Sequence, residues 1–453
     1  MCGAPYWGSA TGKMVIDMLQ FGTDGVRGRV GVDLHDADIS RLGAAVAREW
    51  PGTQIVIGHD GRESGAAWLA AFASGVATQG NVVVNAGVVP TPALALAARD
   101  NACVAVAITA SHNLWHDNGV KVFAPGGRKL SDDQQRRIEL LWQSSDAVST
   151  LEPVGVNAVS PYVAQSYVAA LTRGLSLDSF GGREILIDCA NGATSTVASS
   201  VMQALQIRAD IRHAEPSGRN INDGCGATHP QTLSAECAQR GVIGIAFDGD
   251  GDRLIAVDEQ GHVVDGDCLI ALAAVDLLDR GVLTHNTVVV TSMTNLGFHR
   301  AMAARNITVV TTDVGDRAVL VAMEAGGYVL GGEQSGHLIH ALHATTGDGM
   351  LSALLLLDVV RRSGRSLSDL ASAAMQRLPQ VLRNVRVSVK PSNIELLLAD
   401  ELQRERALLG NDGRIVLRTS GTEPVVRIMV EAVSIALADE VTTRLEQVVR
   451  SRT

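Results

Sequence analysis

The stretch that decides the fold is ITASHNLWHDNGVKVF, which runs from Ile108 to Phe123. It continues an apolar run that begins at Cys103, and the length and β-branched residues of that run are typical of a fully buried strand. Two polar residues, Ser111 and His112, follow almost at once. Because open α/β sheets bind ligands just beyond the carboxyl ends of their strands, the pattern predicts a functional loop here.

The arrangement around this stretch occurs three times along the chain. Each copy alternates three strands with helical segments, which predicts parallel pairing through helical crossovers. The third strand of each copy enters a polar, glycine-rich loop, and the three loops are TASHN, DGDGDR and GEQSGH. If the three copies pack around one cleft, these loops converge. The strands are expected at 54–58, 81–85 and 103–108, then 184–187, 207–211 and 242–247, then 287–290, 307–310 and 328–330.

The last part of the chain has a different pattern. From about Ser366 it shows a helix, the apolar alternation NVRVSVK, and two strands around the turn SGTE, followed by a closing helix. We therefore expect an α/β fold of three similar mixed-sheet domains plus a C-terminal α+β lid domain around a central cleft. The expected domains are residues 1–156, 157–256, 257–368 and 369–453.

The composition limits the classes of partner. The chain has 453 residues, and its 48 acidic against 38 basic residues give a net charge of -10. This balance argues against a nucleic-acid or anionic-membrane partner, because such binding needs an excess of Lys and Arg. No run approaches the roughly 18 apolar residues of a membrane span. Six cysteines without CxxC spacing favour a reduced, cytoplasmic protein.

DGDGDR is the strongest local signal. On an extended segment its three carboxylates, Asp248, Asp250 and Asp252, would face one point. Without a basic neighbour they would repel one another unless a cation lies between them. Oxygen ligands select a hard ion such as Mg²⁺. A calcium loop is the alternative, since Glu259 stands at the twelfth position, although the apolar LIAV after Arg253 favours a strand instead.

Ser111 and His112 leave two further interpretations open. A nucleophile–base pair is disfavoured, because neighbours on an extended chain point in opposite directions and no GxSxG elbow surrounds Ser111. Ser111 could instead be a helix N-cap. Lys121, after the turn at Gly119, is a candidate proton shuttle or phosphate clamp.

Three other loops carry candidate binding groups. FGTDGVRG contains Arg27, and this motif taken alone is typical of a surface turn. GEQSGH offers a carboxylate, a hydroxyl and an imidazole, a set suited to sugar hydroxyls or an amine. RTSGTEPVVR is typical of an anion-binding turn flanked by two arginines. The candidates in these last two loops are Glu333, Ser335 and His337, and Arg418, Ser420, Gly421, Thr422 and Arg427.

Five separated motifs together resemble a known family. FGTDGVRG, TASHNLWHDNGVKVF, DGDGDR, GEQSGH and RTSGTEP, in this order, are similar to the α-D-phosphohexomutase superfamily, and the likeness covers the chain from about Phe21 onward. CANGAT, NINDGCGATH and TTGDGM resemble its bacterial phosphoglucosamine mutase branch most. One departure is Leu114, where the family usually has proline.

The resemblance implies a role for each candidate. Ser111 is expected to be the phosphoserine, which holds Mg²⁺ together with the three aspartates of DGDGDR. Arg27 and Arg253 would flank the transferring group, and His112 and Lys121 would assist proton transfer. Glu333 and Ser335 would bind the sugar with His337 nearby, and the arginine turn would hold the non-reacting phosphate.

The resemblance also implies an activity and its alternatives. The expected reaction interconverts glucosamine 6-phosphate and glucosamine 1-phosphate, with glucose 1,6-bisphosphate or glucosamine 1,6-bisphosphate as activator or intermediate. The product would feed UDP-N-acetylglucosamine and cell-wall synthesis. The phosphorylated hexosamine is then the partner, and a homodimer is one expectation. The alternatives are a phosphomannomutase or phosphoglucomutase, and a catalytically silent sugar-phosphate-binding protein.

Overall fold

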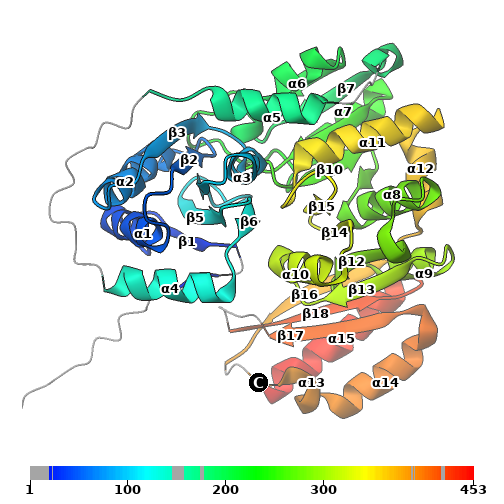
Figure 1. Cartoon of the computed structure of the whole chain (residues 1–453). Helices are drawn as coiled ribbons and strands as arrows, with labels where there is room; N and C mark the ends of the chain where they lie inside the picture. The colour runs from blue at the N-terminus through cyan, green and yellow to red at the C-terminus, as the bar shows by residue number, and fades with distance from the viewer. Residues whose placement is uncertain are drawn as a thin grey trace, which may run out of the picture.

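The computed structural model describes residues 20–22, 24–144, 158–173, 178–388, 391, 393–419 and 424–453. They form four sheets with helices packed against them. In Figure 1 the blue and cyan first unit stands beside the green and yellow second and third units, and the orange and red C-terminal unit lies below the third. This arrangement confirms the expected α/β fold class. In the described part of the chain, no helix is long and apolar enough to cross a membrane.

The first unit is built on a mixed sheet in the order β1-β5-β4-β2-β3, with β6 beside β5. Strands β2, β3 and β4 are parallel, as the sequence predicts, whereas β5 returns antiparallel to β4. The strands are β1 (Val26–Arg29), β2 (Ile55–His59), β3 (Val83–Val88), β4 (Val104–Ile108), β5 (Asp117–Ala124) and β6 (Arg128–Lys129). The helices are α1 (Asp36–Glu49), α2 (Gly65–Ala77), α3 (Thr91–Asp100) and α4 (Asp132–Gln143).

The second unit repeats this topology in the order β11-β10-β9-β7-β8. Its first strand is again flanked by the two later parallel strands, and β10 again returns antiparallel. The strands are β7 (Glu184–Asp188), β8 (Arg208–Arg212), β9 (Ile243–Phe247), β10 (Leu254–Val257) and β11 (Val263–Val264). The helices are α5 (Tyr162–Thr172), α6 (Ala198–Ala204) and α7 (Gln231–Arg240), with short 3-10 turns at Asp178–Gly182 and Ala193–Thr196.

The third unit has the order β13-β12-β14-β15 and ends in the same antiparallel return. Its helix α11 begins at the Asp348 side chain, which accepts a hydrogen bond from the Leu351 N–H at 2.9 Å. The strands are β12 (Thr287–Thr291), β13 (Thr308–Thr312), β14 (Leu330–Gly332) and β15 (Leu338–His340). The helices are α8 (Gly266–Asp279), α9 (Leu296–Ala303), α10 (Asp316–Gly326), α11 (Gly349–Ser363) and α12 (Leu367–Ala374), with a 3-10 turn at Thr284–Asn286.

The C-terminal unit is a three-stranded antiparallel sheet in the order β16-β18-β17. Strand β16 starts earlier than the NVRVSVK alternation predicts, because it pairs along the whole length of β18. The strands are β16 (Gln380–Arg386), β17 (Arg414–Thr419) and β18 (Val425–Glu431). The helices are α13 (Ile394–Leu397), α14 (Ala399–Leu409) and α15 (Ile435–Arg452), with a 3-10 turn at Gly410–Asp412.

The hydrophobic core joins three of the units. One cluster of buried side chains runs from the first unit through the second to the third, for example from Phe123 through Phe247 to Phe298. The C-terminal unit has a core cluster of its own, which contains Val426 and Leu445. The first three units therefore share one core, and the fourth packs beside them.

Candidate functional site

The three glycine-rich loops all lie inside antiparallel hairpins. Each joins the third parallel strand of its unit to the strand that returns beside it: β4 to β5, β9 to β10 and β14 to β15. A loop between two hydrogen-bonded strands has both ends fixed, so its polar residues project from the sheet edge at a set place. This shared topology places TASHN, DGDGDR and GEQSGH at equivalent positions.

Ser111 links the first loop to the second. Its hydroxyl donates to Asp248 Oδ2 at 2.7 Å, and its side chain is buried. Ser111 has a φ of 55°, in the left-handed region. No helix follows it in the described structure, since the next element is β5, so the interpretation of Ser111 as a helix N-cap is wrong.

His112 lies closer to Ser111 than an extended chain would allow. The left-handed backbone of Ser111 brings its Oγ to 3.5 Å from His112 Nδ1. The expectation that the two side chains point in opposite directions is therefore wrong. Burial, followed by the positive charges of Arg253 and Arg27, lowers the pKa of His112 to about 4. A neutral imidazole beside the hydroxyl can accept a proton at neutral pH.

The three loop aspartates converge as the sequence predicts. Carboxylate oxygens of Asp248, Asp250 and Asp252 all lie within 4.8 Å of one another, and all three residues are buried. The segment is a hairpin turn and not an extended strand, with Gly251 at a φ of 73°. The convergence therefore comes from the turn, and not from the alternation of an extended chain.

Lys121 is a basic neighbour of the acidic loop, although the two lie far apart along the chain. Its ammonium lies 2.9 Å from Asp250 Oδ2 and 2.8 Å from Asp252 Oδ2. Burial raises the pKa of Asp252, but Lys121 and then His337 outweigh burial and hold this pKa well below its usual value. Burial, with Asp252 and Asp250 next, raises the pKa of Asp248. Lys121 thus neutralises part of the acidic loop, and Asp248 lies farther from that charge.

The acidic loop still has free capacity for a hard cation. Asp250 Oδ1 and Asp252 Oδ1 are buried and have no hydrogen-bond partner among the described residues. Buried carboxylate oxygens without partners are costly, and oxygen-only donors suit Mg²⁺. The calcium alternative is wrong, because the Glu259 carboxylate accepts hydrogen bonds from the Leu367 and Ser368 N–H groups at 3.0 and 3.1 Å, at the start of α12. The residues present therefore fit a magnesium site.

Arg253 and Arg27 border this cluster. Arg253 Nε lies 3.9 Å from Asp248 Oδ2 and 3.8 Å from Asp252 Oδ1, and it has no hydrogen-bond partner among the described residues. Arg27 is ion-paired with Asp24, and its Nε is likewise unpartnered in the described structure. Both arginines lower the pKa of His112, so their charges act at the same point. Unfilled guanidinium donors at one place suit a phosphate group.

The three candidate residues of the third loop, GEQSGH, differ in their exposure and in their contacts. Glu333 Oε1 accepts from the Gly315 N–H at 3.0 Å, and Ser335 is exposed. His337 is 2% exposed, and its Nε2 accepts from the Gly347 N–H at 3.2 Å, while Nδ1 lies 3.6 Å from Asp252 Oδ1. His337 is therefore buried, and its side chain lies against the DGDGDR loop.

The arginines of the C-terminal unit lie opposite each other. Arg418 on β17 pairs in register with Arg427 on β18, and both line a pocket of about 190 Å³. Burial and then Arg427 lower the pKa of Arg418, whereas Glu333 raises it, so the third loop lies within electrostatic range. Arg427 Nε is buried without a hydrogen-bond partner among the described residues. Of the candidates in this turn, Ser420, Gly421 and Thr422 lie outside the described residues.

Several residues at the site were not identified from the sequence. Asp24 is ion-paired with Lys121 at 3.1 Å and Lys129 at 2.9 Å. Thr91 donates through Oγ1 to Asp250 Oδ2 at 2.7 Å. Lys129 also binds Asp316, which faces His337. Asp24 lies in the FGTDGVRG motif and Thr91 begins α3 after Pro90, but a single sequence does not reveal partners that lie so far away along the chain.

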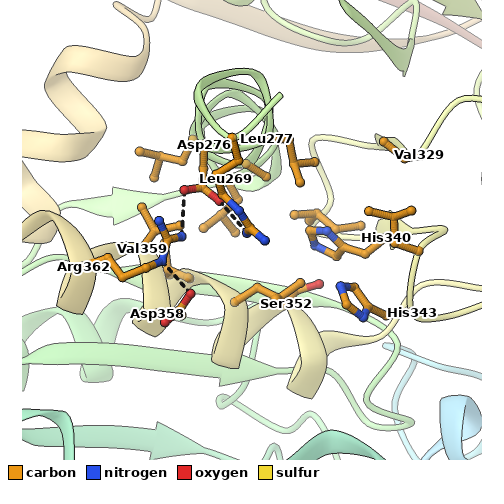
Figure 2. A pocket seen from close by; sticks show the side chains of 17 residues that line it. Leu269, Asp276, Leu277, Val329, His340, His343, Ser352, Asp358, Val359 and Arg362 are labelled. Carbon is orange, nitrogen blue, oxygen red and sulfur yellow. Dashed lines mark hydrogen bonds and ion pairs between the residues drawn. The ribbon is translucent and has the colours of Figure 1, made fainter. Parts of the chain in front are cut away.

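Two other features are separate from this site. Asp188, His213 and Cys225 also lie within 4.8 Å of one another, but Asp188 accepts from the Ala190 and Gly226 N–H groups and joins two loops of the second unit. Burial, followed by Asp188, raises the pKa of Cys225 to about 12, so its thiol is protonated. Figure 2 shows a pocket between α8 and α11, crossed by ion pairs of Arg362 and lined by none of the predicted site residues.

Comparisons with known proteins place the chain in a family. Three models of the phosphoglucomutase/phosphomannomutase family match it: alpha/beta/alpha domain I at residues 18–148, alpha/beta/alpha domain III at 265–378 and the C-terminal domain at 382–448. A phosphoglucosamine mutase from Frankia casuarinae is 46% identical, with 95% of this chain and 98% of the relative covered. Proteins of the same name from Pelotomaculum thermopropionicum and Listeria monocytogenes are each 43% identical, over 95% of this chain and 99% and 98% of the relatives.

Solved structures agree on the fold. A putative phosphomannomutase from Thermus thermophilus has a TM-score of 0.79 at 23% identity, covering 95% of this chain and 99% of that one. An N-acetylphosphoglucosamine mutase from Aspergillus fumigatus has a TM-score of 0.69 at 18% identity, covering 96% of each chain. The family models and the relatives at 43–46% identity confirm the resemblance drawn from the five motifs. The chain belongs to the phosphoglucomutase/phosphomannomutase family, within the phosphohexomutases.

Proposed function

We propose that the protein is a phosphoglucosamine mutase, which interconverts glucosamine 6-phosphate and glucosamine 1-phosphate through a phosphoserine at Ser111. The observation that carries this proposal is the 2.7 Å hydrogen bond between the buried Ser111 hydroxyl and Asp248, a member of the acidic cluster. Full-length relatives at 43–46% identity bear the name phosphoglucosamine mutase. A serine held against a cation-binding cluster has the groups that phosphoryl transfer requires.

The reaction conserves one phosphoryl group on the enzyme. The free hydroxyl of the sugar phosphate attacks the phosphorus on Ser111, the bond from phosphorus to Oγ breaks, and a 1,6-bisphosphate forms. After the intermediate turns over, Ser111 Oγ accepts the other phosphoryl group and the second monophosphate leaves. His112 takes the proton of the attacking hydroxyl and later returns it, since its neutral ring lies 3.5 Å from Ser111 Oγ. Lys121 holds charge in place, because its buried ammonium is ion-paired.

A divalent ion and two arginine groups complete the proposed site. Asp248, Asp250 and Asp252, with the seryl phosphate, would hold Mg²⁺, which neutralises charge on the transferring group when bound. Arg27 and Arg253 would contact the transferring phosphoryl group. The paired arginines of β17 and β18 would hold the non-reacting phosphate, and Glu333 and Ser335 the sugar. A site that recognises only the charge of a phosphate group can bind either phosphate of the 1,6-bisphosphate, so it serves both orientations of the intermediate.

Further properties are proposed on narrower grounds. We keep the four expected domains as a proposal but move two of their boundaries. The boundary after residue 256 would cut β10, and the second sheet reaches Val264, so it moves to 264; the boundary after 368 moves to 374, because Leu367 and Leu370 of α12 pack in the shared core. The cytoplasmic location rests on five free cysteines in the described structure. The homodimer rests on the family resemblance alone, and light scattering on the purified protein measures it. The activator would be glucose 1,6-bisphosphate or glucosamine 1,6-bisphosphate.

A coupled assay tests the proposed function. Purified protein, primed with glucose 1,6-bisphosphate, is given glucosamine, glucose and mannose phosphates with Mg²⁺ or with a chelator. We expect the highest kcat/KM on the glucosamine phosphates, and loss of turnover in the chelator. Ser111→Ala should reduce turnover to background, whereas Ser363→Ala, at the end of α11, should match the unmodified protein.

Three results would count against parts of this function. A preference for glucose or mannose phosphates would identify a phosphoglucomutase or phosphomannomutase. Turnover on none of them, with no phosphoserine formed after incubation with the bisphosphate and Mg²⁺, would favour the silent sugar-phosphate-binding protein. Near-normal turnover of Ser111→Ala would refute the phosphoserine.

A further inference from the structure

The backbone of Ser111 is held from outside its loop by two buried side chains, Arg62 and Asn222. Neither was assigned a role from the sequence. Ser111 adopts a φ of 55°, which a non-glycine residue rarely adopts unless the surrounding structure imposes it. The loop contacts that impose it therefore decide where the Ser111 hydroxyl lies.

Arg62 is held in place by Asp60 and binds backbone carbonyl oxygens of the Ser111 loop. Its Nε donates to both carboxylate oxygens of Asp60, at 3.0 and 2.9 Å, and both residues are about 1% exposed. Nη2 also lies 2.9 Å from Asp60 Oδ2, and both terminal nitrogens have further N–H groups that donate to the loop. They reach the carbonyl oxygens of Ser111 at 3.3 Å, Asn113 at 3.4 Å, Leu114 at 2.9 Å, and Asp117.

Asp60 also fixes the other side of the Ser111 peptide. Its Oδ2 accepts from Thr109 Oγ1 at 2.6 Å, and Thr109 Oγ1 accepts from the Ser111 N–H at 2.8 Å. The amide group and the carbonyl group of Ser111 are thus both tied to the Asp60–Arg62 pair. A planar guanidinium with several fixed donors suits this task, whereas a lysine ammonium does not.

Asn222 makes the corresponding contact from the second unit. Its Nδ2 donates to the carbonyl oxygens of Ser111 at 2.9 Å and Asn113 at 3.0 Å, and the residue is 2% exposed. Both partners are acceptors, so the side chain at position 222 has to be a donor. A Cβ on Gly249 would lie 2.7 Å from both Asn222 Nδ2 and the Ser111 carbonyl oxygen, which shows how closely the acidic loop packs here.

We propose that Arg62 and Asn222 are positioning residues of the phosphoryl transfer. Asp60–Arg62 fixes the Ser111 loop to the first sheet, and Asn222 docks the same loop on the unit that carries the acidic cluster. Together they hold the Ser111 hydroxyl at its 2.7 Å contact with Asp248. This inference rests on the proposed function of Ser111. Misplacing a reacting group by about 1 Å can cost on the order of 100-fold in rate.

Asn222→Asp is the sharpest variant, because it keeps the shape and turns the donor into an acceptor that faces two carbonyl oxygens. We expect kcat to fall about 100-fold, with KM for glucosamine 6-phosphate within about threefold. Phosphorylation of Ser111 by glucose 1,6-bisphosphate should slow in parallel. Arg62→Lys, which keeps the charge but loses the fork, should lower kcat in the same way.

Asn191→Asp is the matched control. Asn191 is another buried, left-handed asparagine of the second unit, and its amide donates to the Asn220 carbonyl oxygen without reaching the Ser111 loop. It should lose thermal stability but keep kcat within about threefold. Asn222→Ser, which retains a short donor, should lie between Asn222→Asp and the unmodified protein, and it replaces Asn222→Asp if that protein does not fold.

The outcomes separate the two claims. Unmodified protein with normal turnover, and an Asn222 variant with equally normal kcat, would overturn the positioning role alone. Equal losses of kcat in Asn222→Asp and Asn191→Asp, in proportion to their loss of stability, would overturn it too. Unmodified protein without mutase turnover would instead overturn the proposed function.

Discussion

Lys121 is the side chain on which the charge balance of the site depends. It is 3% exposed and ion-paired with Asp250, Asp252 and Asp24. In Lys121→Met the buried carboxylates lose this partner, and breaking a buried pair typically costs about 3–5 kcal/mol. We expect the free energy of unfolding to fall by roughly this amount in chelator. Added Mg²⁺ should restore more stability to the variant than it adds to the unmodified protein.

Denaturant unfolding with chelator and with Mg²⁺ measures this effect. Arg128→Met is the control, because it removes an exposed cation that pairs with Glu324. Its unfolding free energy should change by less than about 1 kcal/mol. A Lys121 variant that is as stable as the unmodified protein in chelator would contradict the charge balance.

His340 gives the protein a pH-dependent stability away from the acidic loop. Burial, with His343 next, lowers the pKa of His340 to about 4. Its Nε2 is buried without a partner among the described residues. The unfolded chain binds the proton near pH 6.5 and the folded chain only near pH 4, so stability falls as the pH drops through this window. At pH 5 the loss is about 2 kcal/mol relative to pH 7.5.

His340→Gln removes this titration. Unfolding free energies at pH 7.5 and pH 5 should differ by about 2 kcal/mol less in the variant than in the unmodified protein. The other histidines with lowered pKa values, such as His112, remain in both proteins and cancel. Equal pH dependence in the two proteins would show that His340 does not titrate as described.

The sequence predicted which residues form the site better than it predicted the contacts between them. Ser111 and the three aspartates could be found because each follows a buried strand in a distinctive glycine-rich pattern. The left-handed φ of Ser111 could not, since it depends on Arg62 and Asn222, which are remote along the chain. Lys121 was identified as a proton shuttle or phosphate clamp, but its ion pairs depend on a register that sequence does not show.

Two arginines of the β17–β18 hairpin, Arg418 and Arg427, should lower the stability of the sheet but strengthen the binding of phosphate. Arg418 and Arg427 are directly opposite, and like charges in that position destabilise a sheet by roughly 0.2–1 kcal/mol. Arg427→Gln should therefore unfold at an equal or higher temperature. Its KM for glucosamine 6-phosphate should rise about tenfold or more, because a charged hydrogen bond to phosphate is lost.

Steady-state kinetics and thermal unfolding measure the two effects. Arg386→Gln on β16, an exposed arginine of the same sheet, should change neither KM nor the unfolding temperature appreciably. An unchanged KM in Arg427→Gln would remove these arginines from the phosphate site.

Element types were predicted well, and pairing less so. The expected strands before each loop exist within about two residues at each end, because Val- and Ile-rich runs of this length are distinctive. The antiparallel returns β5 and β15 were not predicted as strands, and β16 starts before its alternation. Strand pairing is decided by partners, which a local pattern does not contain.

The whole molecule divides into a shared core and one separate unit. One buried cluster joins the first three units, and the first unit has a second cluster of its own. Among the described residues, the C-terminal sheet and its helices contribute no residue to the joining cluster and have a separate one. The joint between the C-terminal unit and the third unit is polar: Glu431 accepts from the Leu296 N–H at 2.9 Å, and Arg414 donates to the Ser292 carbonyl oxygen at 3.2 Å. We expect the C-terminal unit to open at a lower free energy than the rest, since cooperative units follow continuous cores.

Hydrogen exchange with mass spectrometry tests this division. Peptides of β16 to β18 should exchange faster than those of β4, β9 and β12, and glucosamine 6-phosphate should slow exchange in the β17–β18 hairpin. Peptides from all four sheets that exchange together, with or without the sugar phosphate, would contradict a separately opening unit.

The most direct test follows the phosphoryl group itself. Protein labelled with radioactive phosphate by glucose 1,6-bisphosphate and Mg²⁺ is mapped by peptide analysis and then mixed with unlabelled glucosamine 6-phosphate. We expect the label on the peptide that contains Ser111, followed by its rapid appearance in a sugar bisphosphate. Label found on another residue, retained by the protein, or released only as inorganic phosphate would contradict the account.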